Sequence, residues 1–112
     1  MITIDETNVE RAYMNLTIKD ESKIKEFKGS ELTDLVNWFN DVTDIRSNPT
    51  FKGAATIVGV KIELKDQRVI SILDSGDQFE IQITDPNKGK TVSYWAKEPH
   101  IDAMLATIDN EQ

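Results

Sequence analysis

Hydrophobic and polar residues alternate along residues 10–18, which read ERAYMNLTI. Successive side chains of a β-strand point to opposite faces of a sheet, so this alternation predicts a half-buried strand. Residues 23–29, KIKEFKG, place their apolar side chains less regularly. We interpret them as a short edge strand, separated from the first strand by a turn at KDES, whose lysines protect the open side of the sheet.

The spacing becomes helical in residues 29–44, GSELTDLVNWFNDVTD. Apolar residues at positions i, i+3, i+4 and i+7 predict the buried stripe of one amphipathic helix, with Trp38 at the margin of that stripe. Ser30 is the expected N-cap residue, and Glu31 then lies at the positive end of the helix dipole. Residues 44–53, DIRSNPTFKG, contain proline and glycine and predict a loop. The stripe itself consists of Leu32, Leu35, Val36 and Phe39.

Alternation with a period of two residues then returns and predicts four strands. Links of two to five residues join these strands, so neighbouring strands must be antiparallel and form a meander. Residues 98–108, EPHIDAMLATI, predict a second amphipathic helix, because Pro99 suits the first helical position and the apolar spacing is again helical. The four predicted strands are residues 56–64, 68–73, 78–84 and 91–96.

Together these elements predict an α+β domain. The expected architecture is an antiparallel sheet, made of the four-stranded C-terminal meander plus one or two N-terminal strands, with both helices packed on one face. The 112 residues suit a single globular domain. Residues 1–8 and 109–112 are expected to be loose.

The negative charge of the chain is concentrated in the predicted helices. Residues 29–45 and 98–112 together contain 8 acids and no lysine or arginine, whereas the other residues contain 12 acids and 13 bases. If both helices cover the same face of the sheet, that side of the molecule is acidic. The eight acids are Glu31, Asp34, Asp41, Asp44, Glu98, Asp102, Asp109 and Glu111.

Several classes of chemistry lack the residues they need. The chain has no cysteine and one histidine, His100, which excludes disulfides, thiolate nucleophiles, and metal sites built from cysteines or from several histidines. The turn DPNKGK at residues 85–90 lacks acids that a calcium loop requires. No phosphate loop, nucleophile elbow or zinc spacing is present in the sequence. We therefore expect a non-enzymatic protein without metal or cofactor.

The formal net charge of −7 restricts the partners. Nucleic acid and anionic membranes require a basic surface, so we expect neither to bind directly, whereas a basic protein is a compatible partner. No stretch approaches the roughly 20 apolar residues of a membrane-spanning helix, and the first residues lack the pattern of a signal peptide. We expect a cytoplasmic protein, although an exported domain with its signal removed would have the same composition.

The first functional hypothesis is a binding protein that uses its acidic helical face to occupy a basic site on another protein. Such a surface speeds association and rejects wrongly charged partners. Toxin-neutralising immunity proteins and phage inhibitors of nucleic-acid-handling enzymes are two classes of protein that could act through such an acidic surface. Solvation alone would also explain the acids. The predicted partner-binding residues are Glu31, Asp34, Trp38, Asp41, Asp44, Trp95 and Asp102.

Two other hypotheses come from different classes. The chain could be an accessory module of an exported or cell-surface assembly, joining another sheet through its KIKEFKG edge strand. It could also be a small enzyme that uses His100, but a catalytic histidine would need a nucleophile and an orienting carboxylate that the sequence does not identify. An exposed histidine in the first turn of a helix is the simpler interpretation of His100.

Overall fold

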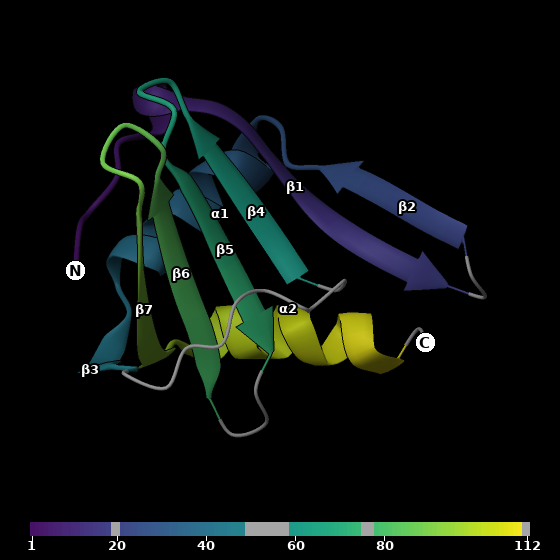
Figure 1. Ribbon diagram of the computed structural model, residues 1–112. Coiled ribbons are helices and arrows are strands. Elements are labelled where there is room, and N and C mark those ends of the chain that lie inside the picture. The colour runs from purple at the N-terminus through teal and green to yellow at the C-terminus, as the bar shows by residue number, and fades with distance from the viewer. Residues whose placement is uncertain (19–20, 49–58, 75–77, 111–112) are drawn as a thin grey trace.

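The computed structural model describes residues 1–18, 21–48, 59–74 and 78–110, and these form seven strands, two α-helices and one short 3₁₀ helix. Figure 1 shows the strands side by side in one sheet, with both α-helices behind it. In chain order the elements are η1 (Glu6–Asn8), β1 (Val9–Ile18), β2 (Glu21–Glu26), α1 (Ser30–Asn40), β3 (Thr43–Ser47), β4 (Gly59–Leu64), β5 (Val69–Asp74), β6 (Phe79–Asp85), β7 (Lys90–Lys97) and α2 (Pro99–Asn110).

The described sheet has the strand order β2-β1-β4-β5-β6-β7-β3, and every neighbouring pair is antiparallel. The predicted α+β class and the predicted meander, β4 to β7, are therefore confirmed. Both N-terminal strands are also present, with β2 at an edge as predicted. The predicted sheet was nevertheless too small, because β3 adds a seventh strand beside β7. The predicted loop at 44–53 is wrong at residues 44–47, which belong to β3, and the predicted turn at KDES is wrong at Glu21 and Ser22, which belong to β2. Residues 19–20 of that turn, residues 49–53 of that loop and residues 56–58 of the predicted strand at 56–64 lie outside the described residues.

The prediction that one helix spans residues 29–44 is wrong at both ends. Gly29, with a φ of 60°, is the N-cap residue in place of Ser30, and Asp41 is the C-cap residue. The chain then turns into β3, which runs along β7 with Thr43 opposite Lys97. Val42, Thr43 and Ile45 are β-branched, which favours a strand over a helix. Sheet pairing therefore ends the helix before the acidic segment ends.

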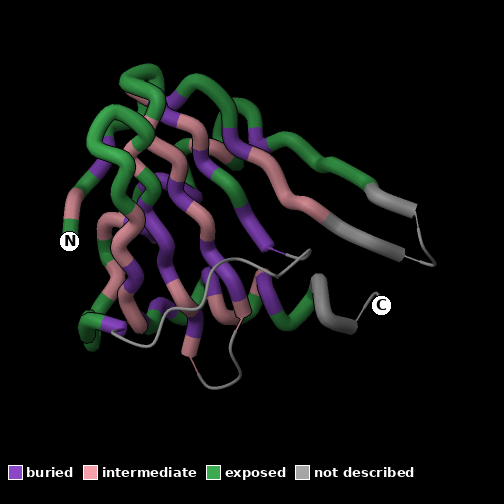
Figure 2. Tube along the Cα trace, in the orientation of Figure 1, coloured by how far each residue is buried: buried purple, intermediate pink, exposed green. Residues whose placement is uncertain are grey.

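The hydrophobic core lies between one face of the sheet and the two helices. Leu35 and Phe39 of α1 and Ile101 of α2 are fully buried, and the predicted helix stripes are confirmed at these positions. The central strands contribute every second side chain to the same core, which includes Ile62 and Ile72. Figure 2 shows buried and more exposed segments alternating along these strands. Both helices thus cover the same face of the sheet, as the acidic-side hypothesis requires.

The amino-terminal residues contact α1. Ile4 is 8% exposed, its N–H donates to the Asn40 side-chain oxygen at 2.8 Å, and the Asn40 side-chain nitrogen donates to the Ile4 carbonyl at 2.8 Å. At the other end, α2 extends to Asn110. The mobility of residues 1–8 and 109–112 in solution stays a prediction.

Candidate partner-binding groove

An open groove of about 220 Å³ lies where the middle of β1 and the end of β2 meet the two helices. Four elements or their flanking residues supply its walls, and the groove therefore exists only in the folded chain. Three of the predicted site residues, all on α1, line it. The lining residues are Met14, Lys25, Phe27, Glu31, Asp34, Trp38 and Met104.

The interior of the groove is apolar. Phe27 is buried, whereas Met14, Trp38 and Met104 are half-buried and pack against the main core. Methionine side chains are unbranched and polarisable, so they adapt their shape to a range of apolar partners. Tryptophan is among the side chains that are enriched where binding energy is concentrated at protein interfaces. The groove can therefore accept an apolar side chain from a partner.

The rim of the groove is charged and has an acidic excess. The Lys25 ammonium lies 3.7 Å from the Glu31 carboxylate, and both side chains are more than half exposed, so this ion pair is weak. Asp34 is exposed, and no lysine or arginine of the described residues forms an ion pair with it. One cation therefore faces two acids, and Asp34 remains available to a cation from outside.

The N-terminus of α2 fixes one wall of the groove. The Trp38 and His100 rings are stacked, with their centroids 5.0 Å apart and their planes at 4°. The Nδ1 atom of His100 lies 2.7 Å from Oε1 of Glu98, which is only 3% exposed. The Glu98 carboxylate also accepts the backbone N–H groups of His100 at 2.9 Å and of Ile101 at 3.3 Å. Glu98 thus caps α2 and holds His100 against Trp38, a role that sequence reasoning missed.

Asp102 is half-buried and lies outside the groove lining. Burial raises the pKa of Asp102 above its ordinary value, and the negative charges of Glu98 and Asp74 raise it further. The carboxylates at this end of the molecule therefore repel one another. The carboxyl group of Asp102 is therefore less available to a partner's cation than that of an isolated exposed acid.

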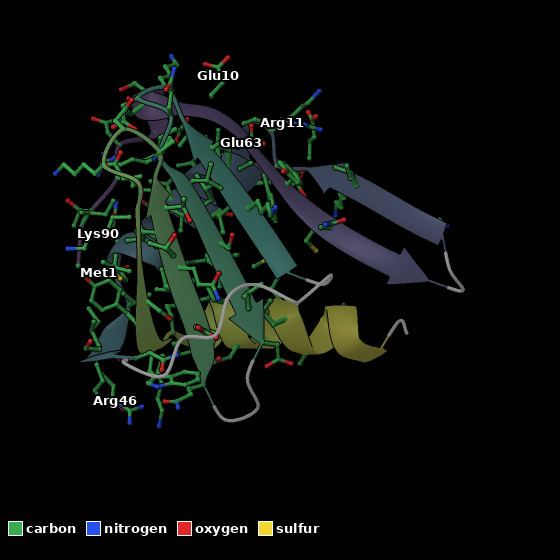
Figure 3. The ribbon with its side chains drawn as sticks, in the orientation of Figure 1. Met1, Glu10, Arg11, Arg46, Glu63 and Lys90 are labelled. Atoms are coloured by element: carbon green, nitrogen blue, oxygen red, sulfur yellow. The ribbon has the colours of Figure 1, made fainter. Side chains whose placement is uncertain are left out.

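The other predicted site residues also lie away from the groove. Asp41 caps the C-terminus of α1, and Asp44 lies in β3 with a φ of 53°. Asp44 is 3.7 Å from the Arg46 guanidinium and 3.8 Å from the Lys97 ammonium. Figure 3 shows Arg46 at the β3 edge, across the sheet from β2. The assumption that Asp44 belongs to an unpaired helical face is therefore wrong.

Trp95 lies on the sheet face opposite the helices, next to a cluster of polar side chains. It is half-buried and stands opposite Glu80 and Arg46 on the neighbouring strands. Oε1 of Glu80 accepts hydrogen bonds from Ser93 at 2.7 Å and from Asn48 at 3.1 Å. Because the members of this cluster satisfy one another, the cluster offers little to a ligand.

The described residues contain no group of three or more histidines or acids placed to hold a metal ion. In the same part of the chain, neither helix has the length and apolar content to cross a membrane. Comparison of the chain with protein-family models, with curated proteins and with solved structures found no match of any of the three kinds. The function is therefore inferred from the geometry and charge of the groove.

Proposed function

We propose that this chain is a non-enzymatic binding protein that docks a basic amphipathic segment of another protein in the groove. One observation carries the proposal: an apolar groove with Trp38 in its wall has Asp34 on its rim, and no described cation pairs with Asp34. An apolar side chain of the partner enters the groove, and a neighbouring lysine or arginine reaches Asp34 and Glu31. The charges on the rim raise the association rate and the specificity, and the apolar contact supplies most of the affinity.

An inhibitory role suits this arrangement. A protein that blocks a basic nucleic-acid channel has to present carboxylates where phosphates would otherwise bind. Immunity proteins and phage inhibitors therefore remain the biological forms that we favour. The partner supplies the basic surface, so the chain itself needs no contact with nucleic acid.

The structure offers a matched pair of acids for the test. Asp34 lines the groove, whereas Asp41, the C-cap residue of α1, is also exposed but lies outside the groove. Asp34→Lys and Asp41→Lys change the net charge equally, so a difference between them reports position rather than total charge. The partner is first captured from a lysate of the source cell, identified, and purified for kinetic measurements at low and high salt.

We expect Asp34→Lys to lower the association rate roughly tenfold and to weaken its salt dependence. Asp41→Lys should change the rate much less. Thermal melts establish that both variants remain folded. Equal rates for the two variants, or wild-type kinetics for Asp34→Lys, would reject the groove as the docking site.

A further inference from the structure

The outer edge of β2 offers backbone hydrogen-bonding groups to solvent. β2 is the last strand at its end of the described sheet, and in Figure 1 it lies beyond β1. The Phe27 N–H donates to the Ala12 carbonyl of β1 at 2.9 Å. Hydrogen-bonded pairs alternate along an antiparallel ladder, so Ile24, three residues earlier, directs its own N–H and C=O away from β1. A further strand could therefore pair with β2 at this position.

The side chains along this edge have a definite pattern. Ile24 is 55% exposed, more than Met1 at 39% or Ile45 at 43%, the other exposed large apolar side chains of the described residues. Ile24 stands opposite Asn15 on the sheet face without helices. Lys23 and Lys25 flank it on the other face, and both are exposed. An added strand would meet lysine, isoleucine and lysine in succession.

This pattern disfavours pairing with a second copy of the chain. Two copies related by a two-fold axis perpendicular to the sheet place some residue of β2 opposite itself. Centring the pair on Ile24 puts Lys23 opposite the second copy's lysine at position 25. Centring it on either lysine puts that lysine opposite itself. Like charges directly opposite one another destabilise an antiparallel pair. In these three registers the lysines thus protect the edge against self-association, as edge lysines commonly do.

The same lysines would stabilise a strand of the opposite charge. We infer that the β2 edge binds an extended segment of a partner protein in which two acidic residues flank an apolar one. The acids face Lys23 and Lys25, and the apolar side chain packs against Ile24. Lys25 is free to change partner, because its only ion pair among the described residues is the exposed 3.7 Å contact with Glu31.

This surface shares Lys25 with the groove but differs from it in position and in charge preference. The groove favours a basic segment through Asp34, whereas the edge favours an acidic segment through Lys23 and Lys25. The inference therefore does not depend on the proposed function. A variant at Ile24 tests the edge and leaves every residue that lines the groove unchanged.

The probe is a synthetic peptide of nine residues with a Thr-Glu-Val-Glu-Thr centre, and the control peptide has lysine in place of both glutamates. Both are titrated to millimolar concentration against the labelled protein, with amide shifts and amide exchange measured by NMR. We expect the acidic peptide to shift the amide of Ile24 and its neighbours and to slow exchange at Ile24. The lysine peptide should produce neither effect. No binding by the acidic peptide, equal binding of both peptides, or shifts confined to the groove would overturn the inference.

Ile24→Pro provides a variant test. Because the N–H of this residue points outward, proline removes the donor to an added strand without removing a bond to β1, and proline is tolerated at such edge positions. We expect at least a tenfold loss of acidic-peptide binding, and unchanged binding would contradict the inference. A second variant, Lys23→Glu, leaves every groove-lining residue unchanged and should lower the preference for the acidic peptide over the lysine peptide. Retention of the wild-type preference would contradict the inference even if the proline variant proved unstable.

Discussion

Asp34 and Asp44 are both exposed acids in one acidic stretch of sequence, but they lie in different surroundings. Asp34 is on a helix that buries its apolar stripe, and it borders an apolar groove. Asp44 is on an edge strand, all of whose residues are exposed, between Arg46 and Lys97. Only the first combines an accessible negative charge with an apolar contact surface. A count of acids along the chain therefore overstates the surface that can attract a partner.

The largest expected difference between the two regions is in stability. Leu35 next to Asp34 is fully buried, whereas Ile45 next to Asp44 is 43% exposed. Leu35→Ala should lower the free energy of unfolding by about 2–5 kcal/mol, because it leaves a cavity in the core. Ile45→Ala should change it by no more than about 0.5 kcal/mol. Urea unfolding of both variants measures the contrast, and similar losses would mean that β3 is packed as firmly as α1.

Glu98 should show a smaller loss of stability, although the sequence groups it with the acids of the helical face. Glu98→Ala removes the acceptor of the His100 and Ile101 N–H groups and should cost about 1–3 kcal/mol. Glu98→Gln keeps an acceptor oxygen and should recover part of that loss. Thermal unfolding of the two variants provides the comparison. A wild-type melting temperature for Glu98→Ala would show that this carboxylate does not hold the start of α2.

The smallest effect concerns the pH dependence of stability at Asp102. The pKa of Asp102 is raised in the folded state, which means that folding disfavours the charged form of this carboxyl group. The contribution of Asp102 to stability is therefore fully present below the ordinary pKa of 3.8, and it is lost as the pH rises through the folded-state pKa. Asp102→Asn removes this titration. The variant should gain stability over wild type by less than about 1 kcal/mol above that window, and the gain should vanish in acid. Melting curves from pH 3 to 7 measure it, and a loss at neutral pH would reverse the sign of this argument.

Most of the fold could be predicted because each element buries one face against a single core. Alternation identified β1 and the meander, and the helical spacing of Leu35 and Phe39 identified α1. Pro99 marked the start of α2 correctly. The edge position of β2 also followed from the sequence, since lysines on a short irregular strand suit a sheet edge.

The strand β3 could not be predicted in the same way. Val42 continues the apolar spacing of the helix, and no glycine or proline marks the end of α1. The chain leaves the helix at Asp41 because β7 offers it an edge, and this contact joins residues about 50 positions apart, as in the pair Ser47 and Tyr94. Asp44, with its positive φ, lies where the register of that pairing shifts, between Thr43 and Arg46. The sequence pattern around residues 41–47 therefore does not indicate this strand pairing.

The groove was predicted only in part. The acids and Trp38 of α1 were identified from charge and spacing. Met14 and Met104 were assigned only to the apolar patterns of their own elements, and Phe27 only to an irregular edge strand. Their meeting at one surface depends on how α2 packs beside α1 and on the position of the β1–β2 pair. Phe27 gave one usable signal, because it lies two residues before the N-cap residue Gly29, close to the position from which an apolar residue often packs on the start of a helix.

The two tryptophans of the chain provide the most direct test of the central claim that the groove is the docking surface. Trp38 lines the groove, whereas Trp95 lies on the opposite face of the sheet. Trp95→Phe and Trp38→Phe each leave a single fluorescent indole, and each variant is titrated with the purified partner. We expect the emission of Trp38 to shift to shorter wavelength as the partner excludes water, while the emission of Trp95 stays unchanged. A shift of Trp95 with no response from Trp38 would contradict the claim and place the partner on the face without helices.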